Sequence, residues 1–203
     1  MFLKEKGLGR VEPMDANYLK NSYLQDKEKI TTVDDQLCKM FQELSELNWK
    51  DLIPGIDTFR ISEKYDPKFE VKYFSPKWGR VGIRFFEHWI PGVFAGVMYD
   101  VNDHKLEFSA PDKGPDFVIL LDIDYKKNNE FNSFEWTKQM KERLVKDHAP
   151  YDKFVSSPKN PWRLAVLQKP FYDIIKDSQT YEEQKECVVR AIQDGVNLII
   201  KNT

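Results

Sequence analysis

Three consecutive segments in the middle of the chain carry strand patterns, and they constrain the fold more than any other feature. They are Arg80–Glu87, Gly92–Asp100 and Asp116–Lys126. Within the third, Phe117–Leu121 is apolar at every position, which is typical of a central strand covered on both faces. Turn sequences rich in Pro, Gly, Asn and Asp separate the segments, so neighbouring strands are predicted to be antiparallel.

Alternation of apolar and charged residues predicts further strands on either side of these segments. Two are expected upstream, over Ile56–Ser62 and Lys68–Phe74, and one downstream, over Trp162–Gln168. The second upstream segment alternates Phe, Val and Tyr with Glu and Lys, which is typical of a half-buried strand. Strands joined by such short links form a meander rather than βαβ units.

Apolar residues at three- and four-residue intervals predict helices at both ends of the strand region. The first is expected to begin after Thr32, a candidate N-cap. A second apolar stripe follows Ser133, and Phe171–Ile175 has the length of one helical turn. The last helix has the clearest pattern, because Thr180 and Glu183 form a capping box in front of a continuous apolar face.

The order of these elements predicts an α+β domain. We expect a mostly antiparallel meander sheet of about five to six strands, flanked by an N-terminal helix and two C-terminal helices. The 203 residues are enough for one sizeable core. Residues 1–31 are dominated by polar side chains and are expected to form an N-terminal arm, whereas residues 32–203 are expected to form a single domain.

Charge and hydropathy limit the classes of partner. The chain has 31 basic and 33 acidic side chains, so its net charge of −2 creates no global attraction to nucleic acid or to an anionic membrane. Nucleic acid thus stays a possible partner through a local basic patch, but the net charge does not support it. No apolar run approaches the ~18–20 residues of a membrane span, and the N-terminus lacks the apolar core of a signal peptide. We therefore expect a soluble cytoplasmic protein with no membrane association. Its two cysteines fit helical apolar patterns and predict buried thiols rather than a disulfide.

Carboxylates at the two ends of the third strand segment suggest one candidate site. Asp116 after Pro115, with Asp124 and Lys126 further on, is similar to the PD…(D/E)xK arrangement of metal-dependent nucleases, which hold Mg²⁺ with two carboxylates. On one uninterrupted strand, however, Asp116 and Asp124 would lie about 26 Å apart at ~3.3 Å per residue, too far to share a metal ion. The spacing therefore argues against the nuclease arrangement.

Asp122 and Asp124 form a better pair, because residues two apart on a strand point to the same face. They are candidate ligand-binding residues. The alternative interpretation is that both aspartates lie past the buried segment and only solvate the end of the strand.

A second candidate site lies on the first strand segment. Arg80 and Arg84 are predicted to share a face with Gly82 and Phe86, and arginine is suited to bidentate binding of phosphate or carboxylate. Gly96 on the neighbouring strand would leave room above the sheet for a ligand or another backbone. The alternative interpretation is a solvated sheet face whose arginines pair with glutamates on the same strands.

Motifs of familiar enzyme classes are missing. The three histidines are scattered, no GxSxG elbow occurs, and no glycine pattern forms a phosphate-binding loop. We therefore predict no metal and no cofactor, and a non-enzymatic binding domain for a protein partner or an anionic small ligand, contacted by Arg80, Arg84, Asp122 and Asp124. The alternative is a metal-dependent phosphodiester hydrolase that uses Asp116, Asp122, Asp124 and Lys126.

Overall fold

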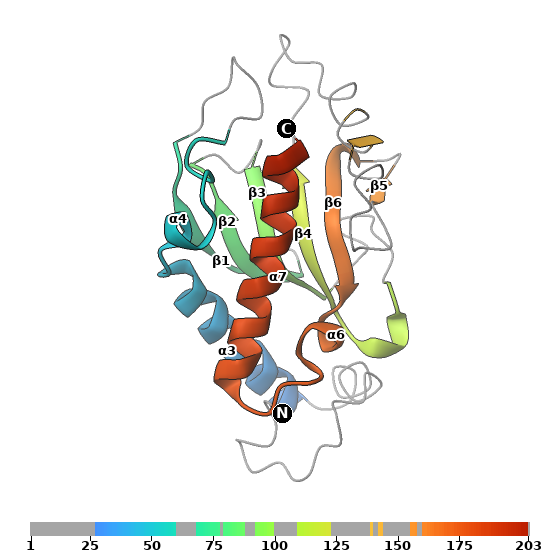
Figure 1. Ribbon diagram of the computed structural model, residues 1–203. Coiled ribbons are helices and arrows are strands. Elements are labelled where there is room, and N and C mark those ends of the chain that lie inside the picture. The colour runs from blue at the N-terminus through green and yellow to red at the C-terminus, as the bar shows by residue number, and fades with distance from the viewer. Residues whose placement is uncertain are drawn as a thin grey trace.

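One antiparallel sheet of six strands forms the centre of the protein, in the order β1-β2-β3-β4-β6-β5 (Figure 1). The computed structural model describes residues 27–59, 68–77, 79–87, 92–99, 109–122, 139, 142–143, 155–157 and 160–202. The elements are α3 (Lys27–Ser45), α4 (Trp49–Leu52), β1 (Val71–Lys77), β2 (Arg80–Phe85), β3 (Gly92–Met98), the 3₁₀ turn η1 (Pro111–Lys113), β4 (Asp116–Asp122), β5 (Val155–Ser157), β6 (Asn160–Pro170), α6 (Phe171–Ile175) and α7 (Tyr181–Asn202). The predicted α+β class with an antiparallel sheet is therefore confirmed.

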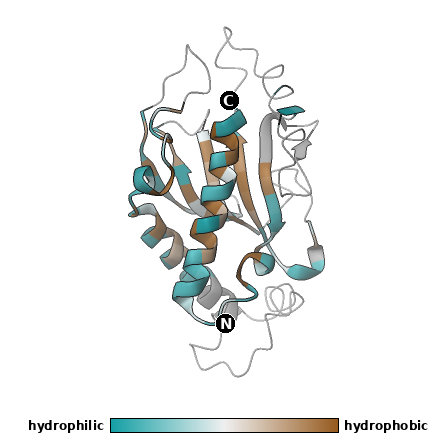
Figure 2. Cartoon of the chain, in the orientation of Figure 1, coloured by the Kyte–Doolittle hydropathy of each residue, from teal (hydrophilic) through white to brown (hydrophobic). Residues whose placement is uncertain are grey.

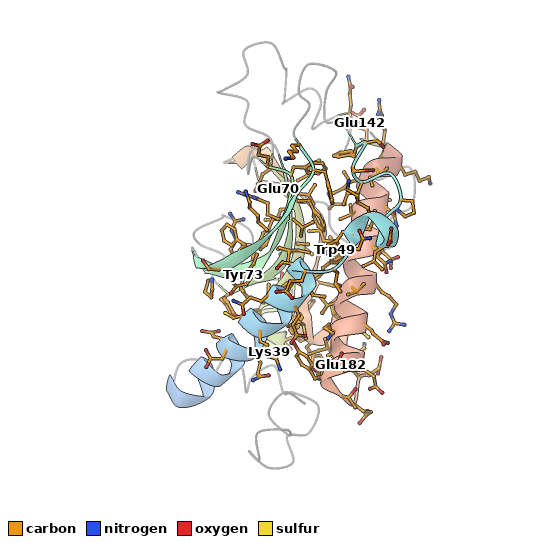
Figure 3. All side chains as sticks on the ribbon, turned by 90° about the vertical axis from the view of Figure 1, so that its left-hand side faces the viewer. Lys39, Trp49, Glu70, Tyr73, Glu142 and Glu182 are labelled. Atoms are coloured by element: carbon orange, nitrogen blue, oxygen red, sulfur yellow. The ribbon has the colours of Figure 1, made fainter. Side chains whose placement is uncertain are left out.

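The two long helices α3 and α7 lie on the same side of the sheet (Figures 1 and 3). α3 packs on β1 and β2, whereas α7 packs on β4 and β6. Side chains alternate across a strand, so every second residue of the sheet points to these helices. β3 and β4 are hydrophobic along most of their length, whereas α7 alternates between hydrophobic and hydrophilic turns (Figure 2). The main core is therefore a single layer between the sheet and the two helices, to which β2 to β4 contribute Val81, Ile83, Phe85, Val93, Ala95, Val97, Phe117, Ile119 and Leu121.

Both long helices contain the apolar faces that the sequence predicts. In α3 the buried residues are Leu37, Met40, Phe41 and Leu44, and in α7 they include Val188, Ala191, Ile192, Val196 and Ile199. The capping box at the start of α7 is confirmed, because the Glu183 amide donates to Thr180 Oγ1 and the Thr180 amide donates to Glu183 Oε2, each at 3.2 Å. None of the helices in the described ranges is long and apolar enough to cross a membrane.

Three local expectations are wrong. Thr32 lies inside α3, which begins at Lys27, so Thr32 is not its N-cap. Leu47, whose spacing from Leu44 predicts a place on the apolar face of the first helix, falls after the end of α3 and is 37% exposed. In the predicted strand Ile56–Ser62, residues 56–58 form a turn that follows α4 and Gly55, while residues 60–62 lie outside the described part of the chain. There Ile56 and Phe59 are buried without any strand partner, so an apolar pattern alone was not enough to assign a strand. Residues 1–26 of the expected arm also lie outside the described part.

Phe86 has a backbone conformation that L-residues rarely adopt, with φ +78°. Consecutive strand residues point to opposite faces, yet Phe85 and Phe86 are both buried in the main core. The positive φ at Phe86 ends β2 and turns its ring back toward the helices, where it contacts Phe59 and Phe69 with ring centroids 5.7 and 5.8 Å apart. The predicted placement of Phe86 on the face of Arg80 and Arg84 is therefore wrong.

The backbone of Phe86 predicts an unusual order of stability for two truncations. Phe86→Ala and Phe86→Gly both lose the buried ring, about 3–5 kcal/mol. Phe86→Gly should nevertheless be the more stable of the two by about 1 kcal/mol, because alanine is strained at this φ and glycine is not. Urea unfolding measures both. At Phe85, a regular strand position, the order should be the reverse, and the same order at both positions would contradict the prediction.

A close helix–sheet contact at Gly195 generates a second prediction. A Cβ at Gly195 would lie 2.3 Å from Cδ1 of Ile119, so Gly195→Ala should destabilise the fold although alanine favours helix by about 1 kcal/mol. Ile119→Val removes that Cδ1 atom. In a double-mutant cycle, Gly195→Ala should therefore become at least about 1 kcal/mol less destabilising in the Ile119→Val background. Ile175→Val, the same truncation elsewhere in the core, should give no such relief, and equal effects in all backgrounds would refute the contact.

Candidate functional site

The outer face of the sheet, defined as the face opposite α3 and α7, carries the predicted arginines. Its apolar residues form a second, smaller cluster of Phe94, Met98, Val118 and Leu120, with Phe74 packed against it. No described helix covers this face, yet these four cluster residues are as buried as those of the main core. The outer face is therefore largely closed to solvent near the centre of the sheet.

Arg80 lies in this closed part, between two aromatic rings. Its guanidinium carbon is 4.8 Å from the ring centroid of Phe74 on β1 and 4.7 Å from that of Phe94 on β3. The side chain has no exposed surface. Stacking of a guanidinium on aromatic rings is favourable, and more so away from water. Arg80 is therefore held as part of the packing of this face and is closed to solvent.

A pair of glycines provides the space that these rings occupy. Gly82 and Gly96 face each other across β2 and β3. A Cβ at Gly82 would lie 2.3 Å from the carbonyl oxygen of Ala95, and one at Gly96 would lie 2.2 Å from that of Val81. The ring of Phe94 covers both glycines, at 2.9 and 2.7 Å from the same two Cβ positions. The room above Gly96 that the sequence suggested for a ligand is thus filled by Phe94.

Arg84, four residues along the same strand, has a different environment. It is half-buried and lies directly opposite Lys72 of β1 in the sheet register. Lys72 forms an ion pair with Glu70, and Nζ of Lys72 lies 2.5 Å from Oε1 of Glu70. The hydrogen bond that Arg84 makes is long, from Nη2 to the carbonyl oxygen of Glu87 at 3.5 Å, and its buried Nε has no hydrogen-bond partner among the described residues. Arg84 therefore forms no ion pair with a carboxylate in the described structure.

Asp116 is buried at the start of β4 and accepts hydrogen bonds from Ser109 and Gln168. Its Oδ2 receives the amide of Ser109 at 2.9 Å, the Ser109 hydroxyl at 3.0 Å and the side-chain amide of Gln168 at 2.6 Å. These donors tie the segment before β4 and the strand β6 to the end of the sheet.

Asp122 is buried at the other end of β4, opposite Gly92 of β3. At ~3.3 Å per residue, about 20 Å of strand separates it from Asp116, so these two carboxylates cannot hold one metal ion. Asp124 and Lys126 lie outside the described residues. Within the described ranges, no group of three His, Cys, Asp or Glu side chains could hold a metal ion. The structure thus brings Arg80 and Arg84 to one face, but it does not bring Asp116 to Asp122.

A polar contact between α3 and α7 was not predicted from the sequence. Glu43 of α3 accepts hydrogen bonds from the Tyr181 hydroxyl at 3.0 Å and from Lys185 at 3.1 Å. Lys39 lies 5.1 Å from the centroid of the Tyr181 ring, and Figure 3 shows Lys39, part-way along α3, near Glu182 at the start of α7. The signal for this contact is weak in the sequence, because its residues lie more than a hundred positions apart.

A second set of polar groups lies beneath α3. Burial raises the pKa of Asp34, although a hydrogen bond from Tyr99 acts against it. Burial likewise raises the pKa of the Cys38 thiol, against a hydrogen bond from Tyr73. A raised thiol pKa lowers the thiolate fraction, so Cys38 has the character of a packed side chain rather than a nucleophile. On α7, the Cys187 sulfur lies 3.2 Å from Nη2 of Arg190 and 3.4 Å from the Ser178 hydroxyl.

No protein-family model, curated protein or solved structure matches this chain.

The contact at Glu43 predicts a pH dependence of stability. Burial raises the pKa of Glu43, but the hydrogen bonds from Lys185 and Tyr181 outweigh it and hold this pKa below its ordinary value of 4.5. The ionised carboxylate therefore stabilises the folded state above that value, and the contribution is lost as the pH falls through the lowered folded-state pKa. Because Glu43 is about one third exposed, we expect no more than about 1 kcal/mol.

Urea unfolding of the wild type and of Glu43→Gln at pH 7 and at pH 3 measures this contribution. The wild type should be more stable than the variant at pH 7, and the difference should largely disappear at pH 3. A difference that is unchanged between the two pH values would contradict the ionic origin of the contact.

Proposed function

We propose that this protein is a non-enzymatic cytoplasmic binding domain that docks an anionic group of a partner on the outer face of the sheet, at Arg84 and Lys72. The observation that carries the proposal is that Arg84 lies opposite a second cation and has no carboxylate partner among the described residues. Like charges directly opposite each other destabilise a sheet, and because among the described residues Glu70 pairs with Lys72 alone, an anion bound to Arg84 would relieve the cost that remains.

The location of the pair supports the proposal. β1 is one of the two edge strands, so a partner can reach Lys72 without crossing the rest of the sheet. Lys72 is 55% exposed, whereas Arg84 is half-buried and therefore partly desolvated, which strengthens its interaction with an anion. The planar guanidinium can donate two parallel hydrogen bonds to a carboxylate or a phosphate.

The environment of Arg80 supports a structural role beside the site. Arg80 stacks on Phe94, which lies opposite Arg84 in the sheet register, so this cluster borders the site. Arg80 has no exposed surface, so a direct ligand contact, as the sequence suggested, would require the side chains around it to move. Arg80 is thus a poor choice for testing binding, because its replacement would disturb the packing.

Two free thiols support the cytoplasmic assignment. Cys38 and Cys187 are both unpaired and half-buried. Reduced cysteines are the rule in the cytosol, whereas oxidising compartments favour disulfides. The hydrolase alternative finds no support in the described residues, because β4 holds Asp116 and Asp122 about 20 Å apart.

Thermal unfolding with anionic probes tests this function. A ligand that binds only the folded state raises the midpoint, by about 2–4 °C for each kcal/mol in a chain of this size. We expect inorganic phosphate or a hexaglutamate peptide to raise the midpoint of the wild type at low ionic strength. Arg84→Ala should remove the shift without lowering the midpoint of the unliganded protein by more than a few degrees.

The matched control is Arg190→Ala, which removes an exposed arginine on α7, on the other side of the sheet. This variant should keep the full shift. The proposal fails if neither probe raises the midpoint of the wild type, or if Arg84→Ala and Arg190→Ala respond alike.

A further inference from the structure

Glu70 already places a carboxylate at the edge of the proposed site. Its Oε1 lies 2.5 Å from Nζ of Lys72, and the Glu70 side chain is 27% exposed. Glu70 and Lys72 are two residues apart in extended chain, so their side chains point to the same face. Because Lys72 lies opposite Arg84, the three side chains share one corner of the outer face.

The backbone of Glu70 is fixed by the sheet. The Glu70 carbonyl oxygen accepts the Phe86 amide at 2.8 Å, and the Lys68 carbonyl oxygen accepts the Glu87 amide at 2.9 Å. These two bonds extend the pairing of β1 and β2 beyond the ends of both strands. The Glu70 carboxylate is therefore anchored next to Lys72 rather than carried on a loose segment, and it contacts Lys72 but not Arg84.

We infer that Glu70 is an internal competitor for this site, and that the external ligand is a carboxylate of an acidic peptide segment. The inference rests on the proposed function. An incoming carboxylate would bind Arg84 through the planar fork of the guanidinium and would compete with Glu70 for Lys72. The Glu70 carboxylate that contacts Lys72 is the same chemical group as the side-chain carboxylates of a partner's aspartates and glutamates, so the two can compete for Lys72.

Charge complementarity supports an acidic peptide as the occupant. Lys72 and Arg84 outnumber Glu70 in this corner, so a local positive charge remains although the whole chain carries a net charge of −2. The attraction is therefore short-ranged and should weaken with salt, because the Debye length is ≈ 10 Å at 0.1 M ionic strength. The exposed position of Lys72 at the sheet edge suits an extended segment that lies beside β1.

Binding of a fluorescently labelled hexaglutamate peptide, measured by anisotropy at low ionic strength, tests the inference. Glu70→Gln should tighten binding about two- to fivefold, because it removes the competing charge of a partly exposed ion pair. Glu87→Gln is the matched control, since it removes the same charge from an exposed residue at the end of β2 that has no ion pair with Lys72. It should change the affinity less than Glu70→Gln does. Lys72→Ala should weaken binding.

The outcomes separate this inference from the proposed function. Equal affinities of Glu70→Gln, Glu87→Gln and the wild type, with binding still lost in Arg84→Ala, would overturn the competitor role alone. Displacement of the peptide by inorganic phosphate at lower concentration than by acetate would overturn the carboxylate assignment. If the wild type binds no more peptide than Arg84→Ala does, the proposed function fails as well.

Discussion

The contact between Gly82 and Gly96 is the constraint on which the outer half of this structure depends. Neither residue can carry a Cβ, because backbone carbonyl oxygens of the facing strand lie only 2.3 and 2.2 Å from the two Cβ positions. A slip of the strands by one residue would place side chains in that space and would exchange the two faces of the sheet. The glycine pair therefore supports a single register of β2 and β3, and the ring of Phe94 packs on it.

The two faces of the sheet are covered in different ways. The face toward the helices is closed by α3 and α7, with Gly195 in direct contact with Ile119 and Glu43 joining the helices. The outer face uses its central space for the aromatic rings around Arg80. Among the described residues of this face, Lys72 and Arg84 oppose each other toward the β1 edge, where Lys72 is exposed and Arg84 is half-buried. The proposed binding site is thus a part of the described outer face that packing does not close.

Arg80 and Arg84 show how far sequence reasoning reached at this site. Their alternation with Val81 and Ile83 predicted correctly that they share a face. The pattern could not show that Arg80 is stacked between Phe74 and Phe94, since these rings come from two other strands and lean along them. Nor could it reveal Glu70 as the partner of Lys72 rather than of an arginine, because that choice depends on side-chain directions at the sheet edge.

The sequence by itself determined the elements whose signals are local. Strand-like segments bounded by turn sequences specified β2, β3 and β4, three- and four-residue spacing specified α3 and α7, and the Thr180–Glu183 capping box marked the start of α7. Tertiary structure decided what depends on contacts between distant segments. A positive φ directs the Phe86 ring into the core, and Ile56 lies in a turn rather than in a strand. Of the two arginines on β2, Arg80 is buried and Arg84 is half-buried. The physical reason is that periodicity reports which face a side chain occupies, whereas its neighbours on that face come from other parts of the chain.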